Sequence, residues 1–137
     1  MRLVPFVKFR RKSAAILDAA AVAAASGADC VMVIDGHSGL IERADAAAHR
    51  MFGWPEGALR GTHVNELIPR AKRNLHDAER VLYMLHPITK PMGPERKVMV
   101  LHRDGGQFEI EAGLSPMSGR RIVFVCHRVV PRERRYE

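Results

Sequence analysis

The stretch 67–104 constrains the fold of this chain more than any other part of the sequence. Ile68-Pro69 favours a helix start, because proline is tolerated in the first turn of a helix but not further in. Pro87 then ends the helix, a Pro/Gly-rich segment follows, and a strand is expected at 98–101 before the turn at 104–106. A long helix carried across to an antiparallel sheet would leave a space for a ligand between them.

Apolar residues within that helix recur at alternating steps of four and three. This spacing predicts one apolar stripe along an amphipathic helix, made of Ala71, Leu75, Ala78, Leu82 and Leu85.

The rest of the chain predicts an α+β domain. An Ala-rich helix is expected at 12–26, because alanine favours helix and Gly27 marks an end. The further helices expected are short and lie at 44–52, 56–59 and 64–67. The further strands expected lie at 30–34, 39–42, 107–114 and 121–130. The first two strands form a hairpin around Asp35-Gly36.

Size and composition limit the class of protein. A chain of 137 residues with 47% hydrophobic content is one domain with enough apolar residues for a core. No apolar run reaches the length of a membrane span, and the basic N-terminal arm lacks the features of a signal peptide. Cys30 and Cys126 are too few for a disulfide framework, so we expect a cytoplasmic protein with both thiols reduced.

The net charge of +7 suggests an acidic partner such as nucleic acid. Two of the basic clusters, at 10–12 and 132–135, lie at the chain ends, where solvated tails are usual. No aromatic residues are interleaved with the basic clusters to stack on bases. We therefore favour solvated tails and keep nucleic-acid binding as an alternative.

Sequence motifs for catalysis are weak, and we do not expect an enzyme. Gly-His-Ser-Gly at 36–39 has the wrong spacing and the wrong context for a nucleophile elbow. The histidines show no H-E-x-x-H spacing. Six of them are interpreted as ordinary surface or edge residues: His37, His49, His63, His86, His102 and His127.

Several short motifs occur in a fixed order along the chain. They are Asp35-Gly36, Ala46-Ala47, Phe52-Gly53-Trp54-Pro55-Glu56 with Leu59 and Gly61, Leu67-Ile68-Pro69, Arg103-Asp104-Gly105, and Phe108 with Glu111. Together they resemble the PAS sensor domain family over about residues 28–130. The resemblance implies a five-stranded antiparallel sheet with short helices, one long crossing helix and an added N-terminal helix. It divides the chain into an arm and dimerisation helix (1–27), a PAS domain (28–131) and a basic tail (132–137).

Within that family, the spacing around His76 resembles oxygen-sensing haem PAS domains. The resemblance would make His76 the axial iron ligand of a haem b and Arg96 the hydrogen-bond donor to bound gas, whereas a surface or capping histidine is the alternative interpretation of His76. Ile110, Ala112 and Leu114 would line the opposite wall. Glu79 and Arg80 argue against haem, because they follow His76 on the same helix face and charged groups are costly to desolvate. The light-sensing flavin PAS domains fit less well, because both cysteines are expected on strands.

The resemblance implies a regulatory PAS module rather than a catalyst. Such a module dimerises through its N-terminal helix (here Ile16, Leu17 and Ala20) and the outer face of the sheet. It relays a signal to an effector, in trans or in a longer chain, and binds a small apolar ligand. On this basis Ile16→Asp or Leu17→Asp should weaken a homodimer. A haem gas sensor and a basic nucleic-acid-binding protein are the two alternatives.

Overall fold

The computed structural model describes residues 27–130 of this chain. The expected helix at 12–26, with Ile16, Leu17 and Ala20, and the basic tail at 132–137 lie outside the described residues. Within the described part of the chain, no helix has the length and hydropathy needed to cross a membrane.

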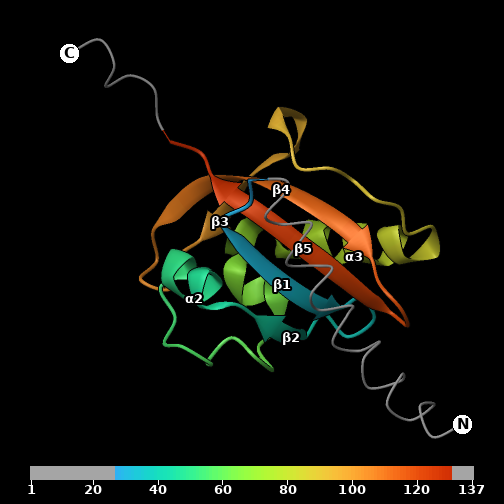
Figure 1. The fold of residues 1–137 in the computed structure, drawn as a ribbon, viewed down its shortest axis with the longest axis horizontal. Coiled ribbons are helices and arrows are strands. Elements are labelled where there is room, and N and C mark those ends of the chain that lie inside the picture. Colours follow the sequence, from blue (N-terminus) through green and yellow to red (C-terminus); the bar gives the residue numbers. More distant parts are fainter. Residues whose placement is uncertain (1–26, 131–137) are drawn as a thin grey trace, which may run out of the picture.

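A five-stranded antiparallel sheet forms the centre of the fold, with the strand order β2-β1-β5-β4-β3 (Figure 1). The strands are β1 (Cys30–Asp35), β2 (Ile41–Ala44), β3 (Lys97–Leu101), β4 (Gln107–Pro116) and β5 (Arg121–Arg128). Every pair of neighbouring strands runs antiparallel. The first and last strands therefore lie side by side within the sheet.

The helix α2 (Ala46–Phe52) begins and ends where local chemistry dictates. The Asp45 carboxylate accepts a hydrogen bond from the Ala48 amide at 2.8 Å, which caps the helix N-terminus. Gly53 ends the helix in the left-handed region at φ 78°, where a side chain would be strained. The predicted helix at 44–52 is therefore confirmed with slightly shorter bounds.

The connection from α2 to the long helix is mostly irregular. The predicted one-turn helix at 56–59 is wrong, because Gly57 has a φ of +83° and interrupts any right-handed helical turn there. The expected short helix at 64–67 is confirmed as the 3-10 helix η1 (Val64–Leu67). A second 3-10 turn, η2 (Arg70–Lys72), follows Pro69 and leads into α3.

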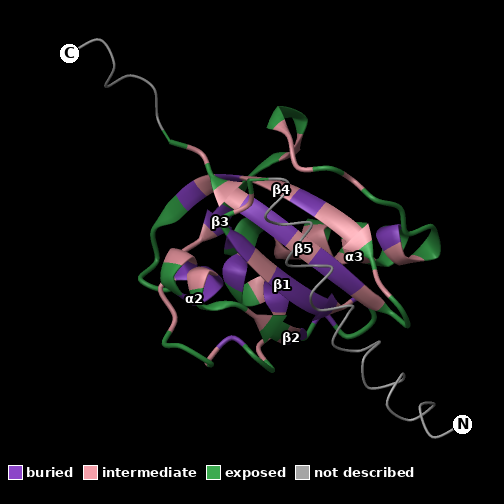
Figure 2. Cartoon of the chain, in the orientation of Figure 1, coloured by how far each residue is buried: buried purple, intermediate pink, exposed green. Residues whose placement is uncertain are grey.

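The long helix α3 (Arg73–Leu85) is present as predicted and ends just before Pro87. A further 3-10 turn, η3 (Pro94–Arg96), precedes β3. The main hydrophobic core is filled from the sheet, α2, the loop after α2 and η1, and no described residue of α3 belongs to it (Figure 2). Its members are Cys30, Met32, Ile34, Ile41, Ala48, Phe52, Leu59, Val64, Leu67, Val100, Phe108, Ile110 and Cys126.

The apolar stripe of α3 faces solvent. A stripe of this kind ordinarily faces the core, yet Leu75, Leu82 and Leu85 are 57%, 65% and 66% exposed. The opposite side of the helix faces the domain and carries Tyr83, which is buried, together with His76, Arg80 and Met84, which are partly buried. The long helix is thus held to the rest of the domain mainly by its polar face.

Candidate functional site

A group of hydrogen-bonded polar residues lies where α3 meets η1. The Asn65 side-chain oxygen is 3.1 Å from Nδ1 of His76, and the Asn65 amide nitrogen donates to the Asp77 carboxylate at 2.9 Å. Because an amide oxygen only accepts hydrogen bonds, Nδ1 of His76 carries the proton in this arrangement. The second ring nitrogen, Nε2, then keeps its lone pair for another partner. We call Asn65, His76, Asp77 and Arg80 the polar cluster.

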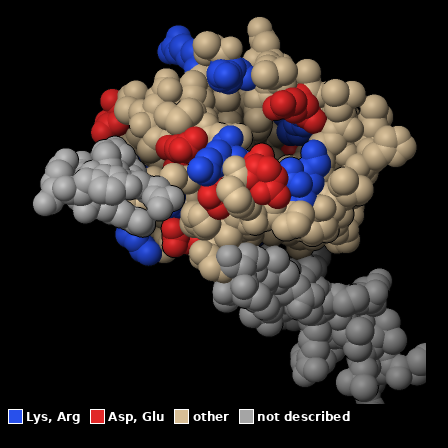
Figure 3. All heavy atoms as spheres, turned by 90° about the horizontal axis from the view of Figure 1, so that it is seen from above, with Lys and Arg blue, Asp and Glu red and all other residues tan. Residues whose placement is uncertain are grey.

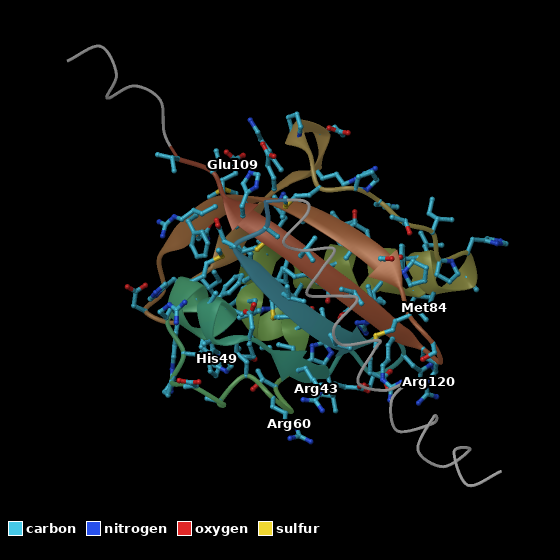
Figure 4. The ribbon with its side chains drawn as sticks, viewed as in Figure 1. Arg43, His49, Arg60, Met84, Glu109 and Arg120 are labelled. Carbon is cyan, nitrogen blue, oxygen red and sulfur yellow. The ribbon has the colours of Figure 1, made fainter. Side chains whose placement is uncertain are left out.

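Arg80 ties the polar cluster to the turn between β1 and β2. Its side chain is only 12% exposed, and Nη1 lies 3.5 Å from the Asp77 carboxylate. Its Nε donates to the carbonyl oxygen of Gly36 at 3.3 Å. A Cβ at Gly36 would collide with the Met84 sulfur, so α3 and this turn pack closely. Figure 4 shows Met84 beside Arg120, whose carbonyl binds the Gly36 amide at the same turn.

The surroundings of His76 keep its imidazole neutral. Burial lowers the pKa of His76 below its ordinary value, and the positive charge of Arg80 lowers it further. The nearby carboxylates of Glu79 and Asp77 act in the opposite direction without reversing the shift. A neutral imidazole with a free nitrogen lone pair can accept a hydrogen bond or ligate a metal ion.

The other predicted site residues lie on separate elements. Ile110 is fully buried in the core of the sheet, and Ala112 packs against that core. Leu114 is half-buried, and its backbone pairs with Lys90. Arg96 belongs to η3, where its Nε donates to the carbonyl oxygen of Pro91 at 3.0 Å. The side chain of Arg96 is therefore engaged within its own loop.

The sequence matches the PAS fold over residues 19–129. The chain belongs to the PAS family. It is 36% identical over 89 residues to the Sensor protein FixL of Bradyrhizobium diazoefficiens. That match covers 65% of this chain and 17% of that protein.

Solved structures confirm the fold of this PAS domain. The LOV protein of Rhodobacter sphaeroides superposes with a TM-score of 0.66 at 14% identity, covering 89% of this chain and 70% of that chain. The PAS domain of the RpfR quorum-sensing receptor of Cronobacter turicensis, in complex with BDSF, gives a TM-score of 0.59 at 14% identity. That match covers 75% of this chain and 96% of the receptor domain. At 14% identity, both structures show the fold of this PAS domain.

The polar cluster fits a haem group only in part. The bond from His76 to Asn65 is the kind of second interaction that orients a metal-bound histidine. Arg80, one turn after His76, instead places a charged and nearly buried guanidinium on the face that a porphyrin would cover. Among residues 27–130, no group of three His, Cys, Asp or Glu side chains is placed to hold a metal ion.

His49 corrects the interpretation of the histidines as surface residues. It is only 4% exposed. Its Nδ1 bonds the carbonyl oxygen of Asp45 at 2.9 Å, and its Nε2 accepts from the amides of Gly57 and Leu59 at 3.0 and 3.1 Å (Figure 4). The sequence could have indicated that His49 is buried, because residues 48, 49 and 52 share one face of α2.

The two cysteines meet across the pair of neighbouring strands β1 and β5. Cys30 and Cys126 are directly paired residues of β1 and β5, both are free, and their sulfur atoms are 3.2 Å apart. The sulfur of Met51 lies 3.7 Å from that of Cys126. The hydrogen bond from Cys126 and then burial raise the pKa of the Cys30 thiol far above its usual value.

We expect both cysteines to resist alkylation in the native protein. The thiolate is the reacting form, and Cys30 stays protonated at neutral pH while both sulfur atoms are buried. Iodoacetamide should label neither residue in native buffer and both residues in denaturant, as measured by mass spectrometry of the digested chain. Rapid labelling of Cys30 in the folded protein would contradict the structure.

The net charge of residues 27–130 differs from that of the whole chain. Residues 27–130 contain 14 Lys and Arg against 12 Asp and Glu, whereas the whole chain contains 22 against 15. Figure 3 shows both kinds of charge mixed on the face that it presents. Most of the net positive charge therefore belongs to the two terminal segments, and the described domain offers little support for nucleic-acid binding.

Proposed function

We propose that this PAS domain senses a small ligand through the polar cluster on the inner side of α3. One observation carries the proposal: the long helix is joined to the sheet side of the domain by the contacts of His76 and Arg80, while its apolar stripe faces water. A helix attached in this way can be shifted by a ligand that competes for a few hydrogen bonds. An apolar core face would resist such a shift.

The relay follows from the same contacts. A ligand acceptor that takes the Arg80 guanidinium would release the Gly36 carbonyl at the turn between β1 and β2. A ligand donor bound to Nε2 of His76 would alter the hydrogen bond between Nδ1 of His76 and Asn65, which belongs to η1. Both changes move α3 relative to the sheet, which is how the domain would pass a signal to an effector. We propose that it does so without catalysis, in the cytoplasm and as a homodimer, with the effector in trans or in a longer chain.

Native mass spectrometry of the freshly purified chain tests this proposal. We expect a retained small molecule on the wild-type chain, which is lost or strongly reduced in Arg80→Met and in His76→Ala. Asn74→Ala is the matched control, because Asn74 lies on the same helix but is exposed. A wild-type chain that carries no added mass under gentle ionisation, or one that keeps it in both cluster variants, would contradict a ligand site at the polar cluster.

A haem-based sensor is the second candidate. The orientation of His76 by Asn65 and the 36% identity to FixL favour it. His76 would hold the iron, Ile110, Ala112 and Leu114 would line the wall, and Arg96 would donate to bound gas. When bound, the group would supply an iron centre that binds a diatomic gas. Arg80 opposes this arrangement, since its charge would be covered by the porphyrin.

Haem titration separates the two candidates. If His76 is an axial ligand hindered by Arg80, then Arg80→Leu should raise the haem affinity at least about tenfold, or about 1.4 kcal/mol. Adding His76→Ala to Arg80→Leu should remove the gain and the Soret band. Equal haem binding by Arg80→Leu with and without His76 would show non-specific association with an apolar surface.

A further inference from the structure

The exposed stripe on α3 has the geometry of a helix-pairing seam. Positions 71, 75, 78, 82 and 85 alternate in steps of four and three, which is the spacing of the two core positions of a heptad. All five residues are exposed, and the three leucines are 57–66% exposed. Ile88, at 58% exposure, extends the apolar surface beyond the end of α3. A partner that buries this seam evenly must itself be a helix.

Side-chain sizes along the seam select the orientation of that helix. In an antiparallel pair of two copies, Leu75 of α3 faces the partner's Ala78, and Leu82 faces the partner's Ala71, which lies in the 3-10 turn η2 just before α3. Both of these kinds of layer combine one large and one small side chain, so they have equal thickness. A parallel pair would instead set leucine against leucine and alanine against alanine, leaving alternating bulges and gaps.

The charges beside the seam fit the same arrangement. Glu79 on α3 and Lys72 at the end of η2 flank the apolar positions, and both are exposed. In the antiparallel register, Lys72 lies near the partner's Glu79, and the contact occurs twice because the pair is two-fold symmetric. Neither residue takes part in an ion pair within the described part of its own chain.

We propose that α3, together with the turn η2 before it, is an interface between two copies of this chain, which pair antiparallel through Ala71, Leu75, Ala78 and Leu82. This interface is distinct from the expected dimer contact at Ile16, Leu17 and Ala20, and it does not depend on the proposed ligand site. A single helix face is smaller than a standard interface. The pairing is therefore concentration-dependent and can respond to movement of α3.

Sedimentation velocity of the full chain over a range of concentrations tests the interface. We expect a dimer. Its dissociation constant should rise at least about tenfold in Leu82→Lys, because a two-fold symmetric dimer contains the substituted residue twice in its interface. Leu40→Lys is the matched control: Leu40 is also exposed, at 42%, but lies in the turn between β1 and β2. Its dissociation constant should stay that of the wild type. Unchanged thermal unfolding of a dilute sample verifies that both variants fold.

Charge reversal tests the register. Lys72→Glu and Glu79→Lys should each weaken the dimer, and the double variant should recover the wild-type dissociation constant. A chain that stays monomeric, or a dimer that ignores Leu82→Lys and responds only to Ile16→Asp, would overturn the proposal. Binding of the monomeric chain to anionic vesicles through the same leucines would also overturn it in favour of a lipid surface.

Discussion

Leu59→Ala is expected to lower the free energy of unfolding by about 2–5 kcal/mol, whereas Leu82→Ala should change it by less than about 0.5 kcal/mol. The two substitutions remove the same atoms. Leu59 is fully buried in the core beside Phe52 and Val64, so its truncation leaves a cavity. Leu82 is 65% exposed on α3 and leaves no cavity in the monomer.

Urea unfolding of dilute protein, followed by circular dichroism, measures both changes under conditions where α3 pairing is absent. The comparison decides which side of the long helix faces the domain. A large loss of stability in monomeric Leu82→Ala would mean that the apolar stripe packs against the sheet, and the polar cluster would then face solvent. Equal small effects in both variants would contradict the position of Leu59 in the core.

The elements predicted from the sequence were those set by short-range chemistry. Asp35 favours the first turn because its carboxylate accepts hydrogen bonds from the amides of His37 and Ser38, at 2.8 and 3.0 Å. Asp45 and Gly53 mark the two ends of α2. These signals lie within a few residues of the structures that they control. The order of strands and helices, and with it the PAS resemblance, was therefore accessible from the sequence.

The orientation of α3 was decided by contacts between distant residues. Periodicity predicted the stripe but not the side on which the domain would lie. Arg80 reaches the carbonyl of Gly36, 44 residues earlier, and Met84 packs against the same glycine. No pattern within the helix encodes that contact. The same limit applies to the candidate site, where the resemblance singled out His76 but not its partners Asn65 and Arg80.

His49→Ala is expected to lower the free energy of unfolding by about 2–4 kcal/mol. Nε2 of His49 accepts from two backbone amides, so Nδ1 carries the proton and donates to the carbonyl oxygen of Asp45. Truncation leaves the buried amide of Leu59 without an acceptor and opens a cavity under α2. The amide of Gly57 is exposed and can turn to water, which limits the loss.

Two substitutions distinguish lost hydrogen bonds from lost volume. His49→Gln keeps a side-chain oxygen that can accept from Leu59, so it should recover part of the loss, whereas His49→Leu fills the space without an acceptor and should not. His37→Ala, at an exposed histidine, is the control and should change the free energy by less than about 0.5 kcal/mol. If leucine were tolerated better than glutamine, packing rather than the two amide bonds would hold the loop after α2 in place. Core packing alone would then determine the conformation of the turn around Gly57 and Leu59.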